Sequence, residues 1–91
     1  MKKYRERQAK KIFAGIDFKV QSSIDVYITL WAKAKKSQNE IKAAEWDGMI
    51  VGTLDCLHDL KILSIQETLL VREYTISQEW EKLENMRNGA A

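Results

Sequence analysis

The sequence predicts an all-α fold in which residues 1–91 form a single domain. The chain contains no proline and only four glycines, so few positions favour a turn or interrupt a helix. Apolar residues recur at steps of three and four, the spacing of one face of an α-helix. Two Ser-x-x-Glu motifs, Ser37–Glu40 and Ser64–Glu67, are typical of helix N-termini, because the serine oxygen accepts from an early backbone N–H.

The first of three principal helices is expected over about residues 3–36. Its apolar stripe consists of Phe13, Ile16, Val20, Ile24, Tyr27, Trp31 and Ala34. Such a helix is about 50 Å long, whereas a compact globule of this length is about 30 Å across. Either a second copy covers the projecting stripe, or the helix breaks at Ser22–Ser23, where Ser22 and Asp25 are suited to cap a new helix. We favour a homodimer with an unbroken or bent helix.

The second helix is expected over about residues 38–60. Its apolar stripe consists of Ala43, Trp46, Ile50, Leu54, Leu57 and Leu60. On the opposite side, small residues follow one another every four positions, at Ala44, Gly48, Gly52 and Cys56. A glycine inside a helix costs about 1 kcal/mol relative to alanine. Two of them favour a close approach by another helix, from the first segment or from a second copy; the alternative is a solvated face that merely tolerates them.

The third helix is expected over about residues 65–87, with Asn88–Gly89 as its stop. Its apolar stripe consists of Ile65, Leu69, Ile76, Trp80 and Leu83. Leu70, Val71 and Tyr74 add apolar groups on other sides, so more than one neighbour must cover this helix. The short link Lys61–Leu63 predicts that the second and third helices form an antiparallel hairpin on which the first helix lies.

Aromatic and small residues supply the candidates for contacts with another chain. Trp31, Trp46 and Trp80 fall on the apolar stripes and are expected to anchor the core. Phe18 lies away from the stripe of the first helix and is expected to be exposed, which makes it the first candidate for such a contact. The complete set predicted at a partner or dimer interface is Phe18, Gly48, Gly52, Cys56, Leu70 and Tyr74.

The charge distribution is uneven although the net charge is only +2. Residues 1–45 carry 11 positive and 5 negative side chains, net +6, and residues 46–91 carry 4 and 8, net −4. The basic cluster at the start consists of Lys2, Lys3, Arg5, Arg7, Lys10 and Lys11. It is interpreted as a solvated, frayed terminus or a surface that docks an acidic partner, or alternatively as a contact with the phosphates of a nucleic acid. The first interpretation is favoured, because Tyr4 is the only aromatic among these residues and no DNA-binding motif is recognisable.

Residues that carry chemistry are sparse, so the sequence predicts neither an enzyme nor a cofactor or metal. Asp55, His58 and Asp59 share one helical face, but the chain has no second histidine to complete a metal site. Cys56 and His58 point in different directions on a helix, which argues against an activated thiol. A lone cysteine is consistent with a cytoplasmic setting, and the longest apolar run, Gly48–Leu54, is too short to cross a bilayer.

One segment resembles a group of known proteins. Trp46-Asp47-Gly48-Met49-Ile50, then Leu57 and Leu60, then Lys61-Ile62-Leu63-Ser64-Ile65-Gln66-Glu67 resemble the helix, short apolar turn and serine-capped helix of small all-α regulatory proteins of bacteriophages and mobile elements. Some of these act as antirepressors, which bind a transcriptional repressor and lift it from its operator. The resemblance covers about residues 41–75 and implies stoichiometric protein binding. The expected function is thus a cytoplasmic, homodimeric, non-enzymatic regulator that occludes a protein partner; nucleic-acid binding is the alternative.

Overall fold

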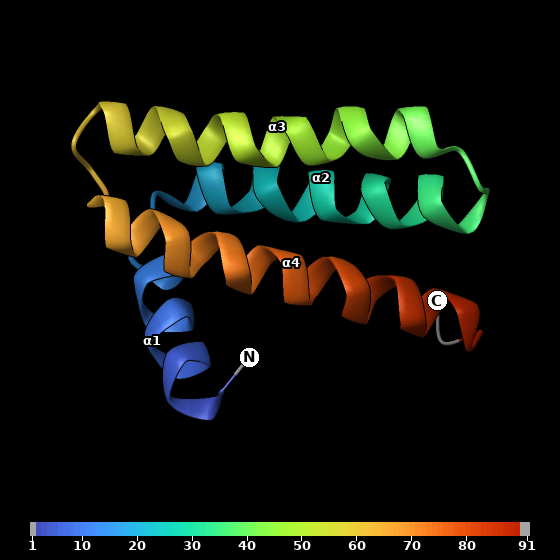
Figure 1. The fold of residues 1–91 in the computed structure, drawn as a ribbon, viewed down its shortest axis with the longest axis horizontal. Coiled ribbons are helices and arrows are strands. Elements are labelled where there is room, and N and C mark those ends of the chain that lie inside the picture. The colour runs from blue at the N-terminus through green and yellow to red at the C-terminus, as the bar shows by residue number, and fades with distance from the viewer. Residues whose placement is uncertain (1, 90–91) are drawn as a thin grey trace.

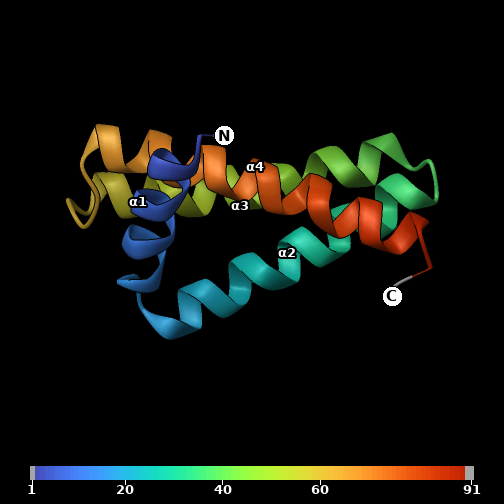
Figure 2. The ribbon, with the colours of Figure 1, turned by 90° about the horizontal axis from the view of Figure 1, so that it is seen from below.

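The computed structural model describes residues 2–89, which form a bundle of four α-helices without a strand among them. The helices are α1 (Lys3–Ala14), α2 (Phe18–Lys36), α3 (Glu40–Asp59) and α4 (Ile65–Arg87). Helix α3 runs antiparallel to both α2 and α4 (Figure 1), and α2 lies along one side of the α3/α4 pair (Figure 2). Helix α1 crosses the N-terminal half of α4. The predicted all-α class and the antiparallel hairpin are confirmed.

The prediction of one long helix over residues 3–36 is wrong, and so is the alternative break at Ser22–Ser23. Helix α1 ends at Ala14 and α2 begins at Phe18. Asp17 starts α2, because its carboxylate accepts a hydrogen bond from the backbone N–H of Lys19 at 2.9 Å. The two serines lie inside α2, where the Ser23 hydroxyl donates to the Lys19 carbonyl instead of capping a helix.

The bend between α1 and α2 is held by hydrogen bonds to the end of α1. The backbone N–H of Gly15 donates to the carbonyls of Lys11 and Ile12, and the Gln21 side-chain amide donates to those of Ala14 at 3.2 Å and Ile16 at 2.7 Å. The chain therefore turns between α1 and α2 instead of continuing as one long helix. The described residues measure 36 × 27 × 19 Å along the principal axes. The overhang that favoured a dimer is absent from this fold.

The sequence predicts the start of α4 correctly but not the start of α3. Ser37 ends α2, and Asn39 starts α3 by accepting from the Lys42 N–H at 3.1 Å, so the predicted serine cap at residue 37 is wrong. Around Ser64 the predicted capping box is confirmed, since Ser64 and Glu67 each accept from the other's backbone N–H. Gly89 follows the end of α4 with a φ of 73°.

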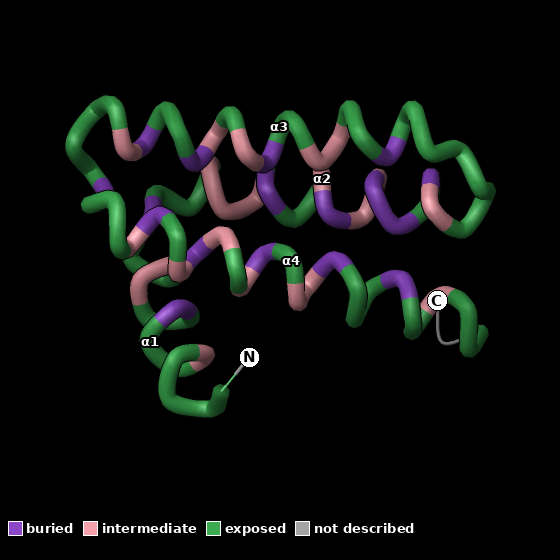
Figure 3. The backbone as a smooth tube through the Cα atoms, viewed as in Figure 1, coloured by how far each residue is buried: buried purple, intermediate pink, exposed green. Residues whose placement is uncertain are grey.

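The core forms two clusters between α2, α3 and α4. Figure 3 shows that buried residues recur along all three of these helices. The larger contains Ile16, Ile24, Ile28, Ile50, Leu54, Leu57, Leu63 and Val71, and the smaller contains Trp31, Ala32, Ala34, Ala43 and Leu83. The predicted stripe from Phe13 to Ala34 is confirmed, since each of its residues is buried or packs against these clusters. On α3 the predicted stripe is confirmed except at its end, because Leu60 is exposed.

Helix α4 buries a different side from the predicted one, and only Leu83 of the predicted stripe is fully buried. Its buried residues are Thr68, Val71, Thr75, Glu79 and Leu83. The remaining members of the predicted core stripe, Ile65, Leu69, Ile76 and Trp80, retain between 39% and 58% of their exposure. The cause is the placement of its neighbours: α2 and α3 cover one side of α4, and α1 covers another side. The side of α4 left uncovered is thus rich in large apolar residues.

The three tryptophans do not all anchor the core. Trp31 is buried, Trp46 is half-buried and stacks on Tyr27 with ring centroids 6.1 Å apart, and Trp80 is exposed, so the prediction holds fully for Trp31 alone. Trp80 packs edge-on against Trp31 at 5.2 Å. The Lys35 ammonium lies 5.7 Å from both of those ring centroids, a cation–π arrangement that joins α2 to α4.

A candidate docking groove

An apolar groove lies between the start of α2, the C-terminal part of α3 and the α3–α4 loop. Its volume is about 630 Å³. It is lined by Asp17, Val20, Gly48, Met49, Gly52, Thr53, Cys56, Leu57, Leu60 and Ile62. The break before α2 creates this groove, because it places Asp17 and Val20 opposite the small residues of α3. The sequence-predicted residues Gly48, Gly52 and Cys56 thus lie together.

The glycines of α3 are open to approach. A Cβ atom built on Gly48 or Gly52 would meet no atom within 4 Å outside its own helix and chain neighbours. No other helix within residues 2–89 therefore approaches them closely, and the predicted approach by the first segment of the same chain is wrong. The approach of a helix from another molecule stays a prediction. Because Gly48 and Gly52 have no side chains, the backbone of a helix from another molecule can pack close to α3 at these positions.

Large exposed side chains belong to the groove lining. Phe18 at the start of α2 is 78% exposed, so its predicted exposure is confirmed, but it is not among the residues that line the groove. Met49, Leu60 and Ile62 are exposed as well and belong to the lining itself. Exposed apolar residues that gather at one place are typical of interaction sites, whereas single ones are ordinary.

Three acidic residues lie at or next to the groove and define its rim. Asp17 belongs to the lining, and helical spacing places Asp55 and Asp59, one turn apart, next to Gly52 and Cys56 on α3. Within the described part of the chain, none of these three carboxylates forms an ion pair. The C-terminal end of α3 adds partial negative charge from its backbone carbonyls. The groove therefore suits an apolar surface flanked by cations.

The His58 side chain is hydrogen-bonded within its own chain. Its ring Nδ1 lies 3.1 Å from the Leu63 carbonyl oxygen, to which it donates. The predicted set Asp55, His58 and Asp59 is thus divided, with the histidine directed at the α3–α4 loop and the carboxylates at the rim. Among residues 2–89, no group of three or more His, Cys, Asp and Glu side chains is arranged to hold a metal ion.

The basic cluster of α1 is spread over two sides of that helix. The guanidinium of Arg5 faces α4 and donates to Glu73 at 2.8 and 3.3 Å. Lys3, Arg7 and Lys10 lie on the outer side by helical spacing, Lys11 stands at its edge where it lines a pocket with α4, and all four are exposed. Lys10 also lies 3.7 Å from Glu6. Part of the charge asymmetry predicted from sequence is therefore used within the molecule, since basic α1 packs against acidic α4.

Helix α1 also covers the apolar groups on the second side of α4. The rings of Phe13 and Tyr74 are 5.6 Å apart, and Leu70 forms a pocket of about 330 Å³ with Ile12 and its neighbours. Leu70 and Tyr74, predicted at an interface with another chain, are half-buried here against α1. Their coverage by the same chain explains why α4 carries apolar groups on this side.

A cluster of ionisable side chains at half-buried and buried positions joins α3 to α4, and no sequence pattern predicted it. The Arg72 guanidinium donates to both carboxylate oxygens of Asp47 at 2.9 and 3.0 Å and lies 3.5 Å from Glu79. Glu79 is 2% exposed, and its Oε2 has no hydrogen-bond partner within the described residues. Burial, and then the neighbouring Asp47 carboxylate, raise the pKa of Glu79 to about 8, although Arg72 opposes this shift. Glu79 is consequently neutral at neutral pH.

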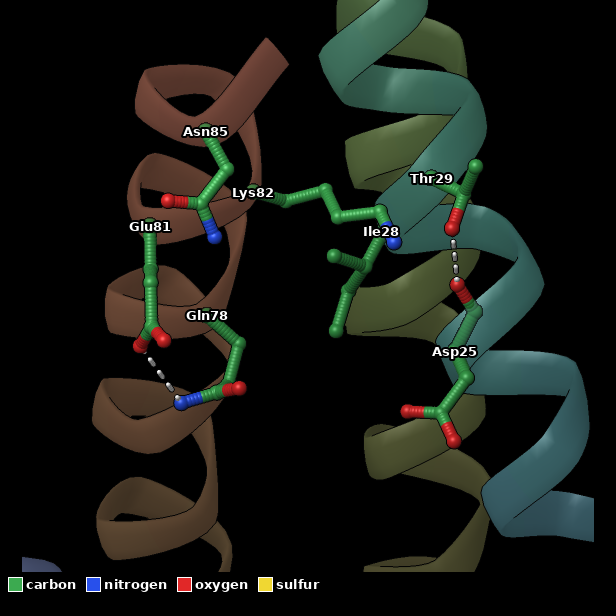
Figure 4. A pocket seen from close by; sticks show the side chains of 7 residues that line it. All are labelled: Asp25, Ile28, Thr29, Gln78, Glu81, Lys82 and Asn85. Carbon is green, nitrogen blue, oxygen red and sulfur yellow. Dashed lines mark hydrogen bonds between the residues drawn. The ribbon is translucent and has the colours of Figure 1, made fainter. Parts of the chain in front are cut away.

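A polar pocket of about 420 Å³ lies between α2 and α4 (Figure 4). Asp25 and Thr29 line it from α2, and Gln78, Glu81 and Lys82 line it from α4. Burial raises the pKa of Asp25, while the charge of Lys82 lowers it. These polar side chains are exposed or half-buried, so water satisfies them. The pocket therefore offers less driving force for binding than the apolar groove.

No protein-family model, curated protein or solved structure was found to match this chain. Within residues 2–89, each helix is too short or too polar to cross a membrane. The geometry of the chain itself is thus the basis for assigning a function.

Proposed function

We propose that this protein is a non-enzymatic binding protein that takes up an amphipathic helix of a partner protein in the groove between α2 and α3. The observation that supports the proposal is the combination found there: a wide apolar lining, an open glycine edge and unpaired carboxylates around it. Grooves of this kind bind the apolar face of a helix through anchors that recur every three or four residues.

The dimensions fit a helix. The stretch of α3 that lines the groove, from Gly48 to Leu60, extends about 18 Å, which equals about three turns of a partner helix. Gly48 and Gly52 permit a short distance between the helix axes. Met49 supplies an adaptable side chain in the lining.

The carboxylates at the groove indicate which residues flank the apolar face of the partner helix. Asp17, Asp55 and Asp59 favour lysine and arginine on either side of the apolar face. Helices that contact DNA are basic in the same way, because they neutralise phosphates. A transcriptional repressor is therefore the partner class we propose, in agreement with the resemblance of residues 41–75 to antirepressors. Occupation of the groove by such a helix would block its contact with the operator.

Enlarging Gly52 tests this function. A synthetic helical peptide with leucines on one face and lysines on its flanks should bind wild-type protein and shift the NMR signals of Gly48, Gly52 and Thr53. Gly52→Leu should weaken this binding about 10-fold or more, because its side chain fills the groove. Ala44→Leu, at an exposed position of α3 outside the groove lining, should bind as wild type does.

The same experiment contains its controls. Gly52→Leu should fold, since the site is open and replacing a helical glycine gains up to about 1 kcal/mol of helix propensity. A peptide with glutamates in place of the lysines should bind about 10-fold more weakly. Equal binding of both peptides, or undiminished binding to a folded Gly52→Leu variant, would contradict the proposal.

A second candidate function rests on the outer face of α1. Lys3, Arg7, Lys10 and Lys11 form an exposed basic surface about 12 Å long, which suits the phosphates of a duplex. If it binds DNA, the double variant Arg7→Gln/Lys10→Gln should lose affinity and show a smaller dependence on salt. Lys33→Gln/Lys36→Gln changes the charge equally on α2 and should have less effect. The absence of any DNA binding at about 50 mM salt would exclude this function.

A further inference from the structure

Helix α1 lies on the outside of the bundle that α2, α3 and α4 form, where it crosses the N-terminal half of α4 (Figure 1 and Figure 2). Within residues 2–89, neither core cluster takes a buried member from α1. Ala9 is the one buried residue between Lys3 and Ala14, whereas α2, α3 and α4 each bury four or more. The buried core therefore belongs to the other three helices.

The apolar contact between α1 and the bundle is incomplete. Ile12 and Phe13 are half-buried where they pack against the larger core cluster, and the Phe13 ring meets Tyr74. Next to Ile12, a space of about 330 Å³ remains between α1 and the start of α4. In a tightly packed contact, side chains fill such a space and gain dispersion energy. Few apolar side chains thus hold α1 in place.

The ion pair between α1 and α4 adds little to that contact. The Arg5 guanidinium lies 2.8 Å from the Glu73 carboxylate, but the two side chains remain 49% and 48% exposed. Water and dissolved salt screen a pair that is so exposed, and its net contribution to stability is small. The attraction between the two helices therefore rests mainly on Ala9, Ile12 and Phe13.

The connection to α2 lets the bundle stay folded when α1 leaves. Ile16, in the turn after α1, is buried in the larger core cluster, and the Asp17 carboxylate caps α2 from within the turn. Once α1 has left α4, its 12 residues cannot remain helical, because isolated helices of this length are marginal in water. We propose that α1 is a separate folding unit, which detaches from α4 and unfolds while α2, α3 and α4 stay folded.

Opening of this unit changes the surface of α4. Leu70 and Tyr74 are half-buried beside α1 in the closed form and become exposed once α1 detaches. Helix α1 is thus a strap that controls access to this side of α4. The inference does not depend on the proposed function, since no residue of α1 or α4 lines the groove. Peptide binding in the groove and opening of α1 can each fail without the other.

Native-state hydrogen exchange, followed by NMR for each backbone amide, tests the opening. The amides of residues 7–14 should exchange about 100-fold or more faster than the slowest amides of α2, α3 and α4, because they need only the local opening. They should also exchange about 10-fold or more slowly than in an unfolded chain, because the closed form predominates. Exchange as slow as that of the bundle, or exchange without any protection, would overturn the proposal.

Two substitutions separate the local opening from unfolding of the whole domain. Leu83→Ala removes a buried side chain from the smaller core cluster, to which no described residue of α1 belongs. This variant should speed the slowest bundle amides about 100-fold and leave α1 unchanged, because the cluster is intact in both the closed and the open form. Phe13→Ala should speed the exchange of α1 about 10-fold, because it weakens the closed form relative to the open one. If Leu83→Ala speeds α1 and the bundle by the same factor, α1 is not a separate unit and the proposal fails.

Discussion

Replacing Glu79 with glutamine should remove a large part of the pH dependence of stability between about pH 4.5 and 8. The buried carboxyl has a pKa of about 8 in the folded protein against 4.5 in the unfolded chain. Between these values the folded state holds one more proton, so the free energy of unfolding falls as the pH rises. The stabilisation is complete below 4.5 and is lost once the pH passes 8.

The size of the effect follows from the shift in pKa. Each pH unit within this interval costs about 1.4 kcal/mol, so wild type should lose about 3 kcal/mol between pH 4.5 and 7 through this group. Glutamine at position 79 carries no titrating proton and occupies a similar volume. Between pH 4.5 and 7 the free energy of unfolding of Glu79→Gln should therefore fall by about 3 kcal/mol less than that of wild type.

Urea denaturation at pH 5 and at pH 8 measures the difference. Glu81→Gln, at an exposed position of the same helix, serves as the control and should retain the wild-type dependence. If Glu79→Gln and wild type lose the same stability between the two pH values, Glu79 is ionised in the fold. The pKa assigned here would then be wrong.

Replacing Leu54 with alanine should destabilise the protein by about 3 kcal/mol, because it leaves a cavity at the centre of the larger core cluster. Leu54 is 1% exposed and packs there with Ile24, Ile50 and Val71, which come from three helices. Domains of this kind typically have a stability of about 5–15 kcal/mol, so a loss of this size is a large fraction of it.

Leu60→Ala provides the matched comparison for the core substitution. This leucine lies at the end of the same helix but is 64% exposed, so the same change should cost less than about 0.5 kcal/mol. Thermal or urea denaturation of both variants measures the contrast. Equal destabilisation by the two substitutions would show that α3 is not oriented as described.

The bend before α2 shows what periodicity can and cannot predict. Phe13, Ile16 and Val20 keep the helical spacing across the bend because all three face the same core, and the break does not interrupt that pattern. The signal that was present is local: Gly15 followed by Asp17, whose carboxylate caps α2. Spacing reports which face of a segment is buried, whereas caps report where the helix axis changes direction.

The orientation of α4 could not be obtained from composition. Ile65 and Trp80 were assigned to the core because they are apolar, yet Thr75 and Glu79 occupy it. Tertiary contacts decide this: α2 and α3 cover the side that contains Arg72 and Glu79, where the two hydrogen bonds from Arg72 to Asp47 compensate in part for the polar side chains. The buried Glu79 is therefore visible only in three dimensions.

The candidate groove was predicted in pieces. Gly48, Gly52 and Cys56 were identified by their regular spacing, and the structure brings Asp17 and Val20 of the α2 start beside them. Phe18, identified by its position off the stripe, is exposed outside the groove lining. The depth of the groove depends on Asp17 and Val20, and their position follows from the bend. Its acidic rim was equally hidden, because Asp17 and Asp55 are far apart in the sequence.

The sole cysteine of the chain gives the groove a further use. Cys56 is exposed and forms part of its lining. Thiol-specific reagents will consequently modify the molecule at this one place, without mutagenesis. A spin label or fluorophore attached there reports on the local environment directly, and the rate of alkylation in the presence of a bound helix measures how completely that helix shields the thiol.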